Sequence, residues 1–259
     1  MSSNDASLEV LSKNAEAFLP GVSVDCVIFG FHDGNMKVLL NRFSGYDKWM
    51  IPGGFVFKDE DVDKAALRIL AGRTGLEDIY LRQFHFFGNS NRTDIDENKD
   101  MLIKLGQLPP DIKGDTHWLL NRFISAGYYA LVEYSKVRIH TNPSEEIEWF
   151  AMDEIPVLYS DHNKIIDKAI STIRPQLSSI PVGYELLPEK FTISELRIIY
   201  ETILGKELDR RNFQRKILST GLVIKLDEMH KKWGFKSSTL FSFDKEKYME
   251  AIENGFPLF

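Results

Sequence analysis

The sequence holds little that would tie the chain to an oxidising compartment or to a membrane. Cys26 is the only cysteine, so no disulfide can form within the chain, and its place in an apolar run predicts a core thiol. No segment approaches the roughly 20 apolar residues that a membrane-spanning helix needs. The first 17 residues lack the basic start and apolar stretch of a signal peptide. These absences predict a cytoplasmic protein with no membrane partner.

Charge is distributed unevenly along the 259 residues, whose net charge is −6. Residues 186–259 contain 13 Lys and Arg against 11 Asp and Glu, whereas the remainder contains 19 against 27. Residues 210–236 alone contain eight basic and two acidic residues. An acidic body with a basic segment near the C-terminus indicates two functions on one chain. A solvated basic face without a partner is the alternative interpretation.

Apolar patterning in the first 180 residues predicts a mixed α/β fold. Asp33-Gly34 lies between two β-rich runs, as in a hairpin, and Pro52-Gly53-Gly54 breaks an apolar stretch. A helical face that begins at Val62 ends before Gly75. The expected strands are 21–31, 36–43, 79–87, 122–134 and 147–152, and the expected helices are 62–73 and 161–173.

Two other segments set the expected domain boundaries. Residues 89–121 are polar and contain Pro109-Pro110, which predicts a long, partly mobile loop insertion. Residues 181–188 begin and end with proline and are the expected linker. The predicted organisation is therefore a flexible start at 1–19, a domain at 20–180 and a C-terminal domain at 181–259.

The C-terminal domain has the element order of a winged helix-turn-helix. Thr192 and Glu195 have the spacing of a capping box, and the helix that they begin ends at Gly205. Asp209 is expected to cap a second helix, 210–219, and Asp244 a last one. Two short strands, 222–226 and 239–243, enclose a polar hairpin. Two helices followed by a two-stranded wing are typical of DNA-binding domains.

Residues 54–76 resemble the Nudix box. In that pattern Gly is followed after five residues by Glu, and after seven more by Arg-Glu, an aliphatic residue, any residue, Glu-Glu, any residue, Gly and an aliphatic residue. The residues in register are Gly54, Glu60, Arg68, Leu70, Gly75 and Leu76. The match covers 23 positions with a fixed strand–loop–helix meaning. It implies the Nudix α/β/α sandwich for the first domain.

The resemblance fails where the chemistry of the box resides. In Nudix hydrolases the glutamates of the two pairs hold magnesium or manganese against a pyrophosphate. The corresponding residues here are Ile69, Gly72 and Arg73, none of which binds a hard cation. Glu60 survives, but one carboxylate is a weak cation site. We therefore predict no catalytic residue, no metal and no cofactor, and expect the domain to be a sensor.

The resemblance extends to the Nudix-related transcriptional regulators over roughly residues 20–255. It includes Phe87-Gly88, Glu148-Trp149-Phe150, Asp161-His162, and the stretch from Leu208 to Phe213. In that family a disabled Nudix domain binds a metabolite, and a C-terminal winged helix binds operator DNA as a dimer. The resemblance implies three properties: a homodimer, double-stranded operator DNA as partner, and a sugar or a sugar nucleotide such as ADP-ribose as effector.

The second helix of the C-terminal domain would carry base readout, because arginine suits guanine edges and Asn or Gln suits adenine. Lysines of the wing would contact phosphates. The candidate DNA-binding residues are Arg210, Arg211, Asn212, Gln214, Arg215, Lys216, Lys225, Lys231, Lys232 and Lys236. An ordinary solvated helix hairpin remains the alternative interpretation.

The candidate effector-binding residues follow from the cleft that the family uses, which is lined by the box loop and neighbouring strands. They are Arg42, Trp49, Gly53, Gly54, Arg92, Arg122 and Tyr128. Arg42 or Arg122 could pair with a phosphate, and Trp49 or Tyr128 could stack on a sugar or base. Each alone is equally well explained as a surface arginine or a core aromatic. His162 is expected to be a capping and interdomain residue rather than a catalytic base.

The leading hypothesis is a ligand-responsive transcriptional regulator. The first alternative is an active hydrolase of a nucleoside diphosphate sugar, whose metal would be held by displaced acids of the insertion, namely Asp94, Asp96, Glu97 and Asp100. The second alternative is an interaction module whose winged helix contacts protein.

Overall fold

The computed structural model describes residues 15–77, 79–112, 117–139, 143–177, 182–230 and 238–254. By its internal contacts the chain divides into two compact units. The first comprises the residues up to 29, 38–130 and 137–169. The second comprises 30–37, 131–136 and the residues from 170 onward.

The first unit is built on a six-stranded sheet whose order is β4-β5-β1-β2-β6, with β3 paired to β1. Its strands are β1 (Phe18–His32), β2 (Asn35–Phe43), β3 (Gly53–Phe57), β4 (Tyr80–Phe87), β5 (Ile124–Leu131) and β6 (Glu145–Ala151). Strand β1 is buried from Val24 to Phe31. Such a continuous apolar run is typical of a strand covered on both faces. The predicted strand 122–134 is shorter, because a 3₁₀ turn, Tyr134–Lys136, follows β5.

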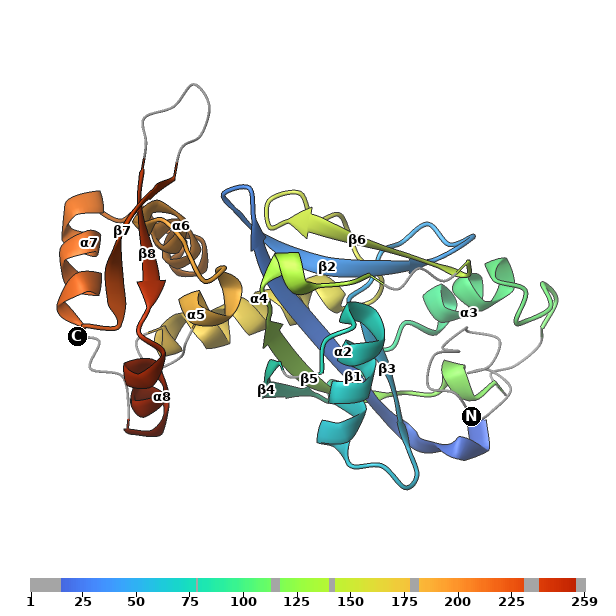
Figure 1. Ribbon diagram of the computed structural model, residues 1–259. Coiled ribbons are helices and arrows are strands. Elements are labelled where there is room, and N and C mark those ends of the chain that lie inside the picture. The colour runs from blue at the N-terminus through green and yellow to red at the C-terminus, as the bar shows by residue number, and fades with distance from the viewer. Residues whose placement is uncertain are drawn as a thin grey trace. The chain divides into compact units, whose positions relative to one another are not determined.

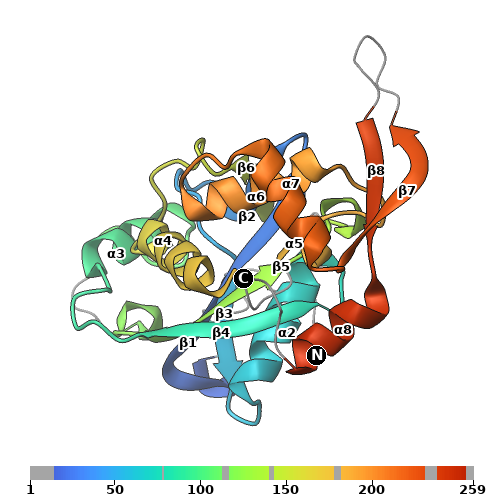
Figure 2. The same cartoon turned by 90° about the vertical axis from the view of Figure 1, so that its left-hand side faces the viewer.

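Helices cover the two faces of this sheet. Figures 1 and 2 show α2 (Val62–Thr74) on one face and α4 (His162–Ile173) on the other. Helix α2 buries Ala65, Ala66 and Leu70, and ends at Gly75, whose φ of 68° lets its N–H reach Ala71 O. The layers confirm the predicted Nudix α/β/α sandwich.

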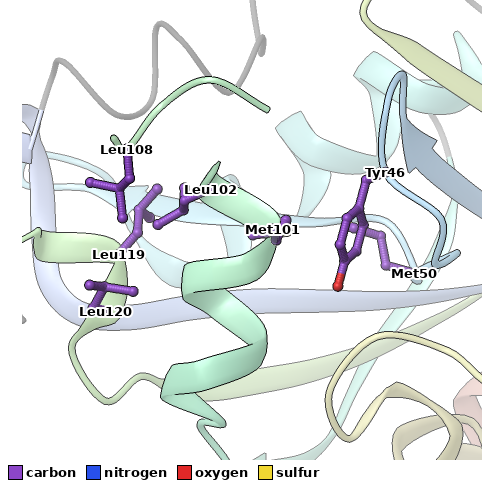
Figure 3. Packing of buried hydrophobic residues seen from close by; sticks show 7 residues of the cluster. All are labelled: Tyr46, Met50, Met101, Leu102, Leu108, Leu119 and Leu120. Atoms are coloured by element: carbon purple, nitrogen blue, oxygen red, sulfur yellow. The ribbon is translucent and has the colours of Figure 1, made fainter. Parts of the chain in front are cut away.

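Residues 89–112 and 117–121 contain more regular structure than the sequence predicted. They contain helix α3 (Ile95–Lys104), whose N-cap Asp94 accepts from the N–H groups of Asp96 and Glu97, and a 3₁₀ turn, Trp118–Leu120. Their apolar side chains form a cluster that anchors the segment to the loop between β2 and β3 (Figure 3). The cluster consists of Tyr46, Met50, Met101, Leu102, Leu108, Leu119 and Leu120. The prediction of a loop was wrong for α3, because tertiary packing onto Tyr46 and Met50 supports a helix with a weak apolar face.

The second unit has the predicted winged helix order. It contains α5 (Val182–Leu186), α6 (Ile193–Leu204), α7 (Arg210–Ser219), β7 (Val223–His230), β8 (Ser238–Phe243) and α8 (Lys245–Asn254). The predicted capping box is present, since Thr192 Oγ1 accepts from Glu195 N and the Glu195 carboxylate accepts from Thr192 N at 2.7 Å. Asp209 caps α7, and Asp244 accepts from Lys247 N. Strands β7 and β8 pair antiparallel, and β7 extends past the predicted end at Leu226.

The expected linker at 181–188 contains a helix instead. Helix α5 fits there because Gly183 permits close approach. A Cβ at this position would lie 2.9 Å from Phe243 Cζ and in hard contact with the side chain of Leu196. Tyr184 then stacks on Tyr248 of α8 with their ring centres 4.0 Å apart. The segment is part of the core of the winged helix, so local prolines misled the linker prediction.

Candidate functional site

The surviving residues of the box hold its loop in shape. Arg68 Nε and Nη2 each donate at 2.7 Å to one oxygen of Glu60, and Nη2 also donates to Phe55 O. The second Glu60 oxygen accepts from Phe57 N at 3.2 Å. Burial would raise the pKa of Glu60, but the hydrogen bonds from Arg68 and Phe57 and the charge of Arg68 hold it below its usual value. Glu60 is therefore a bound carboxylate of the loop, with its oxygens already occupied.

Two of the three positions that hold metal in Nudix hydrolases, Ile69 and Arg73, make other contacts here. Ile69 is buried beneath Gly54, where a Cβ would lie 3.0 Å from Ile69 Cδ1. Arg73 donates to the buried carboxylate of Glu145 on β6, which also accepts from Asn41. Burial raises the pKa of Glu145, and Arg73 and Asn41 oppose that shift. An ion pair thus fills the place of a metal ligand, so these residues do not fit a bound cation.

The acids of residues 94–100 are not gathered around a common point. Asp94 caps α3, Glu97 pairs with Lys48 and accepts from Ser160 N, and Asp100 pairs with Lys104. Within the described parts of the chain, no group of three or more His, Cys, Asp or Glu side chains is placed to hold a metal ion. The displaced metal site that the hydrolase alternative requires has no candidate there.

A cavity of about 160 Å³ lies beside the box, in the first unit. Strands β1, β2 and β3 supply Asp25, Asn41, Gly53 and Gly54, and α3 and its flanks supply Asn98 and Leu119. Aromatic side chains of Phe43, Phe55, Phe123 and Tyr159 complete the wall. The remaining lining residues are Ser23, Met50, Ile51, Arg92, Thr93, Met101, Ser160 and His162. The cavity therefore combines apolar surface with a few convergent polar groups, as small-molecule sites do.

A buried charge cluster of Asp25, Arg92 and Asp161 borders this cavity. Arg92 donates to both oxygens of Asp161 at 3.1 and 3.0 Å, and to Asp25 Oδ2 at 3.2 Å. Burial opposes the charge of Arg92, but the hydrogen bond and charge of Asp161 and the charge of Asp25 raise its pKa above the usual value. Gly53 faces Asp25 across the β1–β3 pair, and a Cβ there would lie 2.8 Å from Asp25 Oδ1. Only glycine leaves room for this carboxylate.

His162 begins α4 and is held neutral in the cavity wall. Its Nδ1 accepts from Ile51 N at 3.0 Å, which leaves Nε2 to carry the proton 3.9 Å from Asp25 Oδ1. Burial lowers the pKa of His162, although Asp25 and Asp161 act in the opposite direction. Next to it, Ser160 has a φ of 52° and donates from Oγ to Arg92 O. This strained turn fixes Arg92 and His162 relative to each other.

A wider cleft of about 680 Å³ shares Arg92 and Ser160 with the cavity. The ends of β4 and α3 line it with His85, Asn89, Asn91 and Glu97, and α4 contributes Lys164 and Lys168 one turn apart. Both lysines are exposed. The two spaces therefore adjoin at Arg92 and Ser160.

The structure brings three of the predicted effector-binding residues, Gly53, Gly54 and Arg92, to the cavity. The other four lie elsewhere. Arg42 stacks on Trp49 at 4.7 Å and pairs with Glu146, Arg122 donates to Gly88 O, and Tyr128 donates to Asp63. Sequence reasoning missed Asp25, Asn41, Tyr159 and Ser160. Asp25 carried a signal, since it is the one charged residue in the apolar run 24–29.

Most of the predicted DNA-binding side chains of helix α7 are exposed to solvent. Arg210, Arg211, Asn212, Arg215 and Lys216 are exposed and Gln214 is half-buried, whereas Phe213 and Ile217 are buried. Phe213 packs edge-on against Tyr200 of α6 with ring centres 5.3 Å apart. Lys225 on β7 is exposed too. The predicted Lys231, Lys232 and Lys236 lie outside the described residues.

Family models match both parts of the chain. The model of the NUDIX domain matches residues 19–171, and that of the NrtR DNA-binding winged helix domain matches residues 183–243. The ADPR responsive transcriptional repressor NtrR of Acinetobacter baylyi is 27% identical, and the alignment covers 93% of each chain. Among the described residues, no helix is both long and apolar enough to cross a membrane.

Two solved structures have the same architecture. The NrtR of Shewanella oneidensis, complexed with a 27mer DNA, is 25% identical with a TM-score of 0.64, and the match covers 88% of this chain and 95% of that one. A MutT/nudix family protein from Enterococcus faecalis is 21% identical with a TM-score of 0.59, over 93% of this chain and 94% of that one. The second match shows the fold alone.

Proposed function

The chain belongs to the Nudix-related transcriptional regulators of the NrtR type, and on this premise we propose that its Nudix unit senses an effector that controls operator binding by its winged helix. One observation carries the proposal. A capped helix with five exposed Arg, Lys and Asn residues follows, on the same chain, a Nudix box whose metal positions hold Ile69, Gly72 and Arg73. The box keeps the residues that shape its loop and lacks those that bind metal.

We propose ADP-ribose as the effector and double-stranded operator DNA as the partner. The Acinetobacter relative is described as an ADPR responsive transcriptional repressor, and the Shewanella protein was solved with DNA. A free pentose is a second candidate, because the cavity by the box could hold a single sugar ring. We also propose that the protein acts in the cytoplasm and that it is a homodimer. Light scattering of the full chain, which measures its molar mass, would test the oligomeric state.

Hydrolysis by the usual Nudix mechanism is not part of this function. Arg73 places a cation where a metal would bind, and Glu60 is already held by Arg68. The full chain, incubated with ADP-ribose and magnesium or manganese, should produce no AMP and ribose 5-phosphate. Turnover that disappears when Asp94 or Glu97 is replaced by alanine would support the hydrolase alternative instead.

A DNA-binding measurement tests the regulatory function. Fluorescence anisotropy at about 0.15 M salt, with the DNA upstream of its own gene as probe, should show specific binding that competitor DNA does not remove. ADP-ribose should release the DNA, whereas AMP should not. Absence of specific binding, with or without ADP-ribose and pentoses, would contradict the proposal. Binding that ignores every effector would refute the sensor role alone.

A further inference from the structure

The cavity beside the box contains two buried polar atoms that have no hydrogen-bond partner among the described residues. Arg92 Nη1, a donor, and Asn41 Oδ1, an acceptor, make no hydrogen bond to any described residue. Both residues line the cavity, and they are deeply buried, with 8% of the Arg92 side chain and 2% of Asn41 exposed. Buried polar atoms are rarely left unpaired, because each unmade hydrogen bond costs free energy. A ligand group that offers both an acceptor and a donor would satisfy them.

The charges around the cavity argue against a phosphate at this place. Arg92 is shared between two carboxylates, Asp25 and Asp161, so the cluster carries an excess of one negative charge. In a site from which water is largely excluded, a diphosphate would be repelled by that excess. An uncharged group with hydroxyl or amide functions meets no such penalty.

The size of the cavity also indicates that it holds an uncharged part of the ligand and not the diphosphate. About 160 Å³ is less than the roughly 300–1,000 Å³ that sites for whole drug-sized ligands occupy. It suits one ring, which the phenyl groups of Phe43, Phe55 and Phe123 could contact. The adjoining cleft is larger, and Lys164 and Lys168 lie there at an i, i+4 spacing on the exposed side of α4. A diphosphate would find its countercharge in that cleft.

We propose that Arg92 and Asn41 form an inner subsite for the uncharged, hydroxyl-bearing ring of a nucleoside diphosphate sugar, and that the diphosphate lies outside, beside Lys164 and Lys168. The proposal rests on the effector role of the Nudix unit and assigns its parts. It also gives residues 89–121 a function, since Thr93, Asn98, Met101 and Leu119 form one wall of the subsite. That wall is fastened by the hydrogen bond from Tyr159 to Asn98 and by the pair of Lys48 with Glu97.

Binding of uncharged fragments tests the inner subsite directly. Saturation-transfer NMR on the full chain should detect ribose or adenosine, and N41L should weaken that binding about ten-fold or more, because it removes the acceptor. The matched control is N35L, the same substitution at an exposed position of the same strand β2. Because Asn41 also donates to Glu145, a second variant, S23L, narrows the cavity without touching that network. Failure of wild type to bind either fragment, or equal binding by wild type, N41L and S23L, would overturn the proposal.

Calorimetry with ADP-ribose tests the outer part. The K164A/K168A variant should bind ADP-ribose more weakly and with a smaller dependence on salt, while its binding of ribose and adenosine stays unchanged. Loss of fragment binding in this variant would refute the division into two parts. DNA binding is measured separately. If DNA is released by ADP-ribose but N41L has no effect, the subsite is wrong and the regulatory function stands.

Discussion

Loss of the ion pair between Arg73 and Glu145 in the variant R73M should lower the free energy of unfolding by an amount that can be worked out from the structure. The Glu145 side chain is 2% exposed and that of Arg73 is 13% exposed, so solvent screens the pair little. Methionine keeps the apolar stem and removes the charge, which leaves Glu145 with Asn41 as its remaining partner. Removing one partner of a buried pair costs about 3–5 kcal/mol of unfolding free energy. Because Asn41 remains, we expect the lower end, about 3 kcal/mol at pH 7.

In R73M the Glu145 carboxyl can escape its unpaired charge by binding a proton. The free energy of that protonation is therefore an upper bound on the part of the cost that comes from charge. Keeping a carboxyl with an unfolded-state pKa of 4.5 protonated at pH 7 costs about 3.4 kcal/mol. At pH 5 the same step costs only about 0.7 kcal/mol. Since the folded-state pKa of Glu145 is raised, folding binds a proton above pH 4.5, and stability falls as the pH rises toward the folded value. R73M removes the positive charge that opposes this shift, so the pKa of Glu145 rises further and stability falls more steeply with pH than in wild type. The deficit of R73M relative to wild type should therefore grow from pH 5 to pH 7.

Urea unfolding followed by tryptophan fluorescence is the assay. Trp49, Trp118 and Trp149 lie in the first unit, so three of the four tryptophans report on it. The matched control is R42M, because Arg42 pairs with Glu146 at the surface, where such a pair contributes about 1 kcal/mol or less. The double variant R73M/E145Q, which buries no charge, should regain most of the loss. The reasoning is refuted if R73M costs no more than R42M, or if its deficit is the same at pH 5 and pH 7.

Three further predictions concern other parts of the molecule. R211A/R215A should weaken specific DNA binding, and if both arginines contact phosphates the slope of log K against log salt should fall by about 0.9 for each; an unchanged slope and affinity would remove α7 from the interface. Because the folded-state pKa of His162 is lowered, unfolding takes up a proton below about pH 6.5. The stability of the first unit should therefore fall by up to about 1.4 kcal/mol per pH unit as the pH drops below that value. H162Q should flatten this slope between pH 6.5 and 5.5, and an equal slope in H162Q and wild type would contradict the burial argument. G183A should destabilise the winged helix by about 3 kcal/mol through overpacking, seen as faster amide hydrogen exchange in α6 and α8, whereas G72A, which meets nothing within 4 Å, should not.

Features set by neighbouring residues were predictable from the sequence. The capping box of Thr192 and Glu195, the left-handed ends at Gly75 and Gly205 and the register of the Nudix box all depend on residues within about one or two helical turns. Those predictions are confirmed to within a residue or two. The loop assigned to 89–121 failed because α3 depends on Tyr46 and Met50, some fifty residues earlier in the chain.

The polar lining of the cavity lay beyond sequence reasoning for the same reason. Arg92 meets partners 67 and 69 residues away, and Asn41 meets Glu145 across 104 residues. No spacing rule connects such positions before the sheet is known. Arg42 and Trp49 show the converse. Both were plausible ligand contacts by residue type, yet they satisfy each other through a cation–π contact.

The hydrogen-bonded pair of Glu60 and Arg68 limits how well a motif search can distinguish sensors from enzymes. Glu60 and Arg68 score as matches to the box, yet each is occupied in holding the turn between β3 and α2. A search that weights all positions alike would therefore place active and inactive paralogues in one class. A better filter would score positions 69, 72 and 73 separately. It would also ask whether an arginine at position 73 has a carboxylate partner, as Arg73 has in Glu145. Such a filter would divide the matching sequences into candidate enzymes and candidate receptors before any protein is purified.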